Sequence, residues 1–181
     1  MNLTLSQQEA ADAFKEFLET DSQVFMLKGA AGTGKTTLIS EFLKILDSEK
    51  RGYTLTAPTG RAAYIIGSKT GHCSFTIHRA IYGLSNLKSI SQNKEEEEDG
   101  GLYLKFGLKG NDDPLRAVYI VDEASLISDA YSENEAFSFG SGYLLTDLFE
   151  FARGRKIVFV GDYAQLPPVG MNFSPALDKK Y

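Results

Sequence analysis

The sequence predicts an α/β protein in which a parallel sheet carries helices on both faces. Four short apolar runs have the character of buried strands, and they lie at Val24–Leu27, Tyr53–Ala57, Val118–Val121 and Ile157–Val160. Segments whose apolar residues recur at helical spacing separate these runs. Because strands that alternate with helices form parallel sheets covered on both sides, we expect the ligand where the strands end.

The expected helices lie around and between these strands. Apolar residues at helical spacing predict helices over Ser6–Leu18, Thr37–Leu46 and Leu144–Phe151, and shorter ones over Arg61–Ile66 and Ile77–Tyr82. The pattern weakens around residues 85–115, which are polar and rich in glycine. We interpret this stretch as an insertion with a small hairpin over Leu102–Leu108, and its acidic run Glu95–Asp99 as a solvated loop.

Composition restricts the class of protein. The chain has 181 residues, which suits one domain, and 43% of them are hydrophobic, which suits a buried core. A net charge of -5 argues against an extended basic surface, so any contact with nucleic acid has to be local. No signal peptide or membrane-spanning run is visible. The single cysteine, Cys73, rules out an intramolecular disulfide and a cysteine-based zinc site, and it suits a reducing cytoplasm.

A glycine-rich motif follows the first strand and opens the next helix. It matches the phosphate-binding P-loop pattern at every position, with the residues Gly29, Ala30, Ala31, Gly32, Thr33, Gly34, Lys35 and Thr36, and Thr37 continues it into the helix. Glycines let backbone N–H groups surround phosphates, and the helix N-terminus adds partial positive charge. We expect Lys35 to contact the β- and γ-phosphates of ATP and the Thr36 hydroxyl to ligate Mg²⁺. The alternative is a turn without a ligand.

Two acids, Asp122 and Glu123, end the strand Val118–Val121. Beside a P-loop, the first acid of such a pair holds Mg²⁺. The second can orient and deprotonate an attacking water, which favours hydrolysis over phosphoryl transfer to another molecule. We therefore expect Asp122 to be a metal ligand and Glu123 to be the general base. The alternative is a pair of exposed carboxylates at a strand end.

Further motifs follow in a fixed order. They are Ala57–Ala63, Thr76–Arg79, Asp122–Ser125 and Gly161–Gly170. Together with the P-loop they resemble motifs Ia, Ib, II and III of the superfamily 1B, or RecD-like, DNA helicases, over about Leu3 to Leu177. The resemblance implies a RecA-like ATP-binding domain, domain 1A, spanning residues 1–181. It also implies ATP-driven movement on single-stranded DNA in the 5′-to-3′ direction, in pathways that include DNA repair and recombination.

The resemblance also assigns roles to single residues. Gln7 resembles the glutamine that reads adenine, with Gln8 as the alternative if the register is shifted by one. Asp162 and Gln165 resemble the motif that senses the γ-phosphate. The expected DNA-contacting positions are Pro58, Thr59, Gly60, Arg61, Thr76 and His78. His78 could stack on a base or cap a helix, and Phe75 is expected in the core rather than as a stacking platform.

Two features depart from the family pattern. Tyr131–Gly142 looks like an insertion after motif II, which we interpret as a surface loop rather than a partner-binding segment. The sequence ends about eleven residues after Gly170, so we expect the second motor domain and its arginine finger to lie outside this chain. Arg153 and Arg155 are expected to be surface charges. The alternative functions are an AAA-type remodeller and a nucleotide-dependent binding module.

Overall fold

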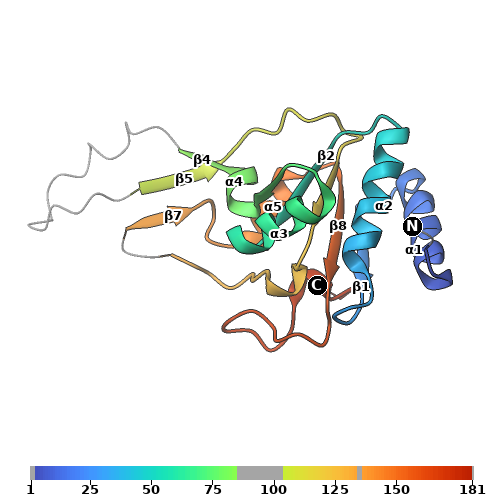
Figure 1. Cartoon of the computed structure of the whole chain (residues 1–181). Helices are drawn as coiled ribbons and strands as arrows, with labels where there is room; N and C mark the ends of the chain where they lie inside the picture. Colours follow the sequence, from blue (N-terminus) through green and yellow to red (C-terminus); the bar gives the residue numbers. More distant parts are fainter. Residues whose placement is uncertain (1–2, 85–103, 134–135, 181) are drawn as a thin grey trace, which may run out of the picture.

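The main feature is a five-stranded sheet in which all neighbouring strands run parallel (Figure 1). The computed structural model describes residues 3–84, 104–133 and 136–180. In spatial order the strands are β1 (Val24–Lys28), β8 (Lys156–Gly161), β6 (Val118–Val121), β2 (Tyr53–Ala57) and β3 (Ser74–Thr76). The four predicted strands are confirmed. The fifth strand, β3, was not predicted, and it forms one edge of the sheet beside β2.

The helices also follow the prediction, with small shifts of their ends. They are α1 (Leu5–Glu19), α2 (Lys35–Ser48), α3 (Gly60–Thr70), α4 (Ile77–Ile81) and α5 (Leu144–Phe151), with single 3₁₀ turns η2 (Ala124–Leu126) and η3 (Pro175–Leu177). Helix α3 runs past the predicted end at Ile66 and stops before Gly71, whose φ of 75° is left-handed. A glycine adopts this conformation without the steric cost that other residues incur.

Two apolar cores lie on opposite faces of the sheet, which confirms that helices cover both sides. Strand β6 alternates between them: Val118 and Ile120 pack with α1, α2 and α3, whereas Tyr119 and Val121 pack with α4, α5 and η3. This alternation is the period of two that a strand imposes on its side chains. In the first core the rings of Phe14 and Phe42 stack with centroids 4.1 Å apart, which fixes α1 against α2.

A second, three-stranded sheet projects from the side of the molecule (Figure 1). Its strands are β4 (Tyr82–Leu84), β5 (Leu104–Leu108) and β7 (Phe137–Phe139). The prediction of a hairpin over residues 102–108 is wrong, because the part from Leu104 onward is one strand. It pairs antiparallel with β4 and parallel with β7. Residues 85–103, including the acidic run, lie outside the described residues.

The insertion after motif II contributes to this second sheet, so its interpretation as a loop was incomplete. Phe139 of β7 stacks on Phe106 of β5, with centroids 4.8 Å apart. Behind the strands, the Tyr82 hydroxyl donates a buried hydrogen bond of 2.6 Å to Asp147 on α5. The aromatic side chains of the insertion therefore pack locally, and the polar pair anchors the sheet to the main body.

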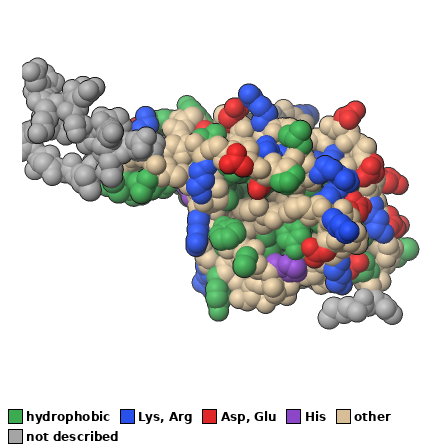
Figure 2. Space-filling view, turned by 90° about the horizontal axis from the view of Figure 1, so that it is seen from above, with side chains coloured by type: hydrophobic (Ala, Val, Ile, Leu, Met, Phe, Trp, Pro, Cys, Tyr) green, Lys and Arg blue, Asp and Glu red, His purple; other side chains and the backbone are tan. Residues whose placement is uncertain are grey.

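Charged groups on the surface have mixed signs. On the face shown in Figure 2, Lys and Arg side chains are interspersed with Asp and Glu. This mixture agrees with the net charge of -5 and with the expectation of local rather than extended contacts to nucleic acid. Within the described ranges, no helix has both the length and the apolar character needed to cross a membrane.

Candidate active site

The P-loop connects the end of β1 to the start of α2. Its first residue is tied to the neighbouring strand, because the Gly29 amide donates to the carbonyl of Gly161 at 3.1 Å. Gly34 precedes the helix with a φ of 86°, and a Cβ there would collide with the side-chain amide of Gln7. The left-handed backbone favours glycine at position 34, and any side chain there would also displace the Gln7 amide.

The backbone N–H groups in the first turn of α2 point toward the P-loop. The first bond of this helix runs from the Leu38 amide to the Gly34 carbonyl at 3.1 Å. The N–H groups of Lys35, Thr36 and Thr37 precede it, so they have no acceptor one turn back in the helix. Such a helix start attracts anions, because several N–H groups and the positive end of the helix dipole converge there.

The Lys35 ammonium is folded into the loop. It donates to the carbonyl oxygens of Gly29 at 2.7 Å and Ala30 at 3.0 Å. These two bonds place the positive charge inside the ring of backbone that the motif forms. A phosphate oxygen is a stronger acceptor for an ammonium than a neutral carbonyl, so the lysine is positioned to exchange these partners for an anion.

The acid pair lies at the end of β6, as predicted. The Asp122 amide donates to the Thr56 carbonyl of β2 at 2.9 Å, which continues the sheet to this residue. Burial raises the pKa of the Asp122 carboxyl to about 6. The backbone N–H of Glu123 and the Lys35 ammonium act in the opposite direction, and the Glu123 charge adds to the rise. Strands β1 and β6 both pair in parallel with β8, so the loop that carries Lys35 and the acid pair leave the sheet at the same edge.

Glu123 has an unusual backbone. Its φ of 52° and ψ of 37° are left-handed, and it directly precedes the turn η2. A residue with a Cβ carries strain in this region, of the order of 1–3 kcal/mol, and such strain clusters at functional sites. The conformation turns the chain sharply between Asp122 and Ala124, and both carboxylates line one pocket.

Asp162 and Gln165 follow β8, the strand between β1 and β6. Asp162 is buried and its carboxylate accepts from the Ala164 amide at 2.8 Å, which forms a tight turn after the strand. The turn brings the Gln165 side chain to the acid pair, where its Oε1 accepts a hydrogen bond from the hydroxyl of Ser125 at 2.7 Å. Ser125 belongs to motif II, but the sequence offered no reason to assign it a partner 40 residues away.

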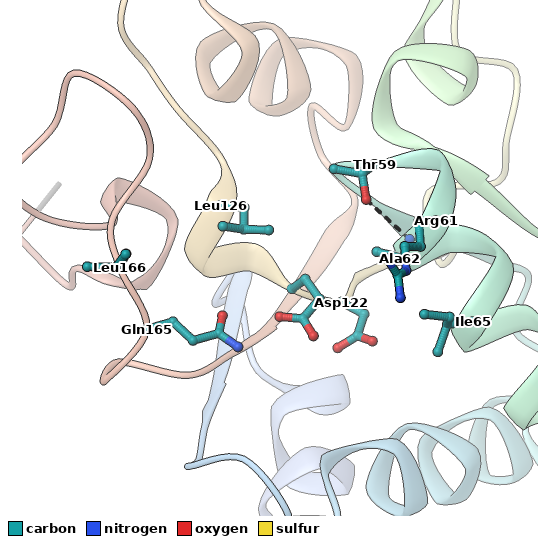
Figure 3. Close-up of a pocket in the computed structure, with 9 residues that line it drawn as sticks. Thr59, Arg61, Ala62, Ile65, Asp122, Leu126, Gln165 and Leu166 are labelled. Atoms are coloured by element: carbon teal, nitrogen blue, oxygen red, sulfur yellow. Dashed lines mark hydrogen bonds between the residues drawn. The ribbon is translucent and has the colours of Figure 1, made fainter.

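A pocket of about 440 Å³ opens beside the acids (Figure 3). The pocket is lined by the start of α3, by η2 and by the segments that follow β6 and β8. The lining residues are Thr59, Arg61, Ala62, Ile65, Asp122, Glu123, Leu126, Gln165 and Leu166. Figure 3 shows Arg61 and Gln165 reaching toward this space from opposite sides. The pocket thus combines carboxylates, an amide and one cation with an apolar rim.

Gln7, rather than Gln8, faces the P-loop. Its amide nitrogen donates to the Thr33 carbonyl at 3.3 Å, while its oxygen accepts from the Thr4 amide at 3.0 Å and completes a capping box at the start of α1. Gln8 instead donates to Asp12 on the exposed side of the helix. Of the two candidates, Gln7 is therefore the one that contacts the P-loop, and adenine recognition by its side chain stays a prediction.

The expected DNA-contacting residues do not all share one environment. Thr59 and Thr76 cap α3 and α4, since their hydroxyls accept from the amides of Ala62 and Arg79. The remaining residues of the first motif lie at the start of α3, next to the pocket, and they are Pro58, Gly60 and Arg61.

His78 lies apart from that pocket. Its ring packs edge-on against Phe139, with centroids 4.9 Å apart, and burial lowers its pKa. The N-cap of α4 is Thr76, so the interpretation of His78 as a helix cap is wrong. The ring belongs instead to the aromatic cluster of the second sheet, and base stacking by His78 stays a prediction.

Phe75 and the two late arginines lie outside the pocket. Phe75 is partly buried in β3 but belongs to neither apolar core, so its expected place in the core is wrong; the Arg79 guanidinium lies over its ring at 5.1 Å. Arg153 is a surface charge paired with Glu150, as predicted. Arg155 donates to the backbone carbonyls of Asn111 and Asp113, so it holds the segment before β6 in place.

The parallel sheet and the P-loop after β1 place this chain in the class of P-loop nucleoside triphosphatases. Within that class the sequence matches the model of a family described as an AAA domain, AAA_30, over residues 3–173. The chain therefore belongs to this family.

Two of the relatives of this chain are DNA helicases. The chain is 30% identical to the ATP-dependent RecD2 DNA helicase of Deinococcus radiodurans, over 81% of this chain and 16% of that protein. It is 29% identical to the ATP-dependent DNA helicase Pif1 of Bdellovibrio bacteriovorus, over 85% of this chain and 31% of the relative. The chain thus spans less than a third of the length of these curated relatives.

Solved structures agree with the fold. The crystal structure of Pif1 helicase from Candida albicans superposes with a TM-score of 0.52 and 22% identity, over 98% of this chain and 37% of that chain. The predicted fold class is confirmed, and the chain corresponds to the N-terminal motor domain of superfamily 1B helicases. These likenesses favour the helicase interpretation over the AAA-type remodeller.

Proposed function

We propose that this chain is the ATP-binding and hydrolysing motor domain of a DNA helicase. In a longer protein it would act with a second motor domain and move along single-stranded DNA. The observation that carries the proposal is the placement of three motifs at one edge of the sheet, where the neighbouring strands β1, β8 and β6 end: Lys35 in the loop after β1, Gln165 after β8, and the acids after β6. The helicase relatives support the same assignment.

The residues present fit a magnesium–ATP complex. Thr36 and Asp122 offer oxygen atoms, which are the ligands that Mg²⁺ prefers. Asp122 is also a partly buried carboxylate with a second acid beside it, an environment in which a divalent cation is favourable. When bound, the cation would offset negative charge on the phosphates. The Lys35 ammonium and the donors at the start of α2 would hold the phosphates from the other side.

In this mechanism Glu123 orients a water molecule and removes its proton. Gln165 donates from its amide to a phosphate oxygen. Thr59 and Arg61 lie on the far side of the same pocket, where a hydroxyl and a guanidinium can contact the phosphates of a DNA strand without reading its sequence. Because the acids and these two residues line the same pocket, hydrolysis of ATP would change the affinity of the domain for DNA.

The binding test compares Lys35→Ala with Lys44→Ala. Both lysines are on α2, but Lys44 is exposed and pairs with Glu41. Charge-assisted hydrogen bonds contribute roughly 1.5–3 kcal/mol, so we expect Lys35→Ala to weaken binding of a fluorescent ATP analogue by about ten- to a hundredfold in the presence of Mg²⁺. Lys44→Ala should bind like the unaltered chain. Equal affinity for all three proteins would contradict the proposed site.

The motor part of the proposal is tested on a protein in which this domain is joined to a second motor domain. Its rate of ATP hydrolysis is measured with and without single-stranded DNA. Stimulation by DNA supports a DNA motor, whereas an unchanged rate would favour a nucleotide-dependent binding module or another P-loop ATPase.

A further inference from the structure

The hydrogen bond between Ser125 and Gln165 joins two segments that leave different strands of the sheet. Ser125 follows β6 in the turn η2, and Gln165 follows β8. The Ser125 side chain is fully buried, with 0% of the residue exposed, and its Oγ lies 2.7 Å from Gln165 Oε1. Because Ser125 is buried, its hydroxyl cannot readily replace this bond with one to water, whereas Gln165 reaches it from the exposed side.

The chemistry of the amide gives this bond a direction. Amide oxygen only accepts hydrogen bonds, so the Ser125 hydroxyl must donate, and the two N–H donors of Gln165 remain at the other end of the group. Gln165 also lines the pocket that contains Asp122 and Glu123, and Figure 3 shows its amide directed into that space. With the oxygen engaged by serine, the end available to a ligand is the nitrogen.

Ser125 is itself held from two sides. Its carbonyl accepts from the Ser174 hydroxyl at 3.0 Å. Its amide nitrogen packs so closely against Gly161 that a Cβ on this glycine would lie 3.1 Å from it. The backbone of η2 is therefore held against the end of β8, which fixes the position from which the serine side chain reaches Gln165.

We propose that Ser125 is a positioning residue that holds the Gln165 amide with its N–H groups toward the terminal phosphate of a bound nucleoside triphosphate. The inference rests on the proposed function. A reversed amide would present oxygen to phosphate oxygens, which is repulsive. Ser125 would thus contribute to the distinction between a triphosphate and a diphosphate without touching the nucleotide.

The experiment measures affinities of the 181-residue chain for the magnesium complexes of ADP and of ATPγS, by calorimetry. We expect Ser125→Ala to weaken ATPγS binding by about three- to tenfold, the scale of one lost hydrogen bond, and to leave ADP binding within about twofold. Gln165→Ala should lose at least as much for ATPγS. The double variant should lose no more than Gln165→Ala alone, because the serine acts through the glutamine.

Ser128→Ala is the matched control. Ser128 is a partly buried serine three residues further on, and its hydroxyl contacts the Met171 sulfur at 3.6 Å. It should leave the ratio of the two affinities unchanged. Equal weakening of ADP and ATPγS by Ser125→Ala, or additive losses in the double variant, would overturn the inference by indicating a general effect on the fold. Failure of the unaltered chain to bind either nucleotide would instead contradict the proposed function.

Discussion

The side-chain amide of Gln7 donates a hydrogen bond to the backbone carbonyl of Thr33, across 26 residues of sequence. The same side chain accepts from the Thr4 amide, and its nitrogen occupies the space that a side chain at position 34 would need. The first helix is therefore attached directly to the P-loop. A change at Gln7 should alter the shape of the loop as well as any contact with the base of the nucleotide.

The first prediction concerns the two adjacent glutamines. We expect Gln7→Ala to reduce ATP affinity by about three- to tenfold, because one hydrogen bond to the loop and any contact with the adenine edge are lost. The same substitution should also lower the ratio of the affinity for ATP to the affinity for GTP. Gln8→Ala is the control, since Gln8 contacts Asp12 on the exposed face of α1. Competition binding with ATP and GTP distinguishes the two, and a larger effect at Gln8 would reverse the assignment.

The positions of these motifs at one edge of the sheet were predictable because the motifs are local in sequence. Eight successive residues specify the P-loop, and the acids follow an apolar strand directly. In a parallel sheet all strand ends of one kind meet at the same edge, so the order of strands and motifs along the chain is enough to place the motifs together. What depends on contacts far apart in sequence was not predictable, as the pairing of Ser125 with Gln165 illustrates.

The second prediction concerns the proposed general base. Glu123→Gln keeps the size of the side chain and its hydrogen-bonding oxygen but cannot accept the proton of water. We expect hydrolysis to slow by at least about 100-fold, while binding of ATPγS changes by less than about threefold. Phosphate release at saturating ATP provides the rate. Glu150→Gln, at an exposed acid paired with Arg153, should hydrolyse ATP normally; near-normal turnover in Glu123→Gln would remove Glu123 from this role.

The third prediction concerns Arg61, the cation on the rim of the pocket. If it contacts one phosphate of a single strand, Arg61→Ala should weaken binding of oligonucleotides of different sequence to a similar extent. The slope of log affinity against log salt should fall by about 0.7. Fluorescence anisotropy over a salt series measures both quantities. Arg153→Ala removes an exposed arginine that follows α5 and should change neither; an unaltered slope in Arg61→Ala would exclude the phosphate contact.

The three strands of the second sheet could not be predicted from the sequence, and the reason is physical. Each of its strands is short, with three residues in β4, five in β5 and three in β7. Two of them contain a glycine, which weakens the preference for extended structure. Their pairing is stabilised by contacts such as Phe106 with Phe139, which join residues far apart in the chain. Strand propensity depends on such packing partners more than on the backbone itself. The edge strand β3, also of three residues, was missed for the same reason.

The last prediction tests what anchors this sheet. Asp147 is buried on α5, where one oxygen accepts from the Tyr82 hydroxyl at 2.6 Å and from the Ser141 amide at 3.0 Å. Burial and the Asp147 carboxylate raise the pKa of Tyr82, so the hydroxyl stays a donor at neutral pH. Tyr82→Phe leaves the ring in place but removes one donor from a buried carboxylate. We expect the free energy of unfolding to fall by about 1–3 kcal/mol.

Urea denaturation followed by circular dichroism measures this loss as a lower midpoint with an unchanged slope. Tyr143→Phe is the control, because Tyr143 is partly exposed at the start of the same helix. That variant should unfold at the midpoint of the unaltered chain. A matching midpoint for Tyr82→Phe would mean that the aromatic contacts of Tyr82 with Phe139 and His78 hold the second sheet without help from the hydroxyl.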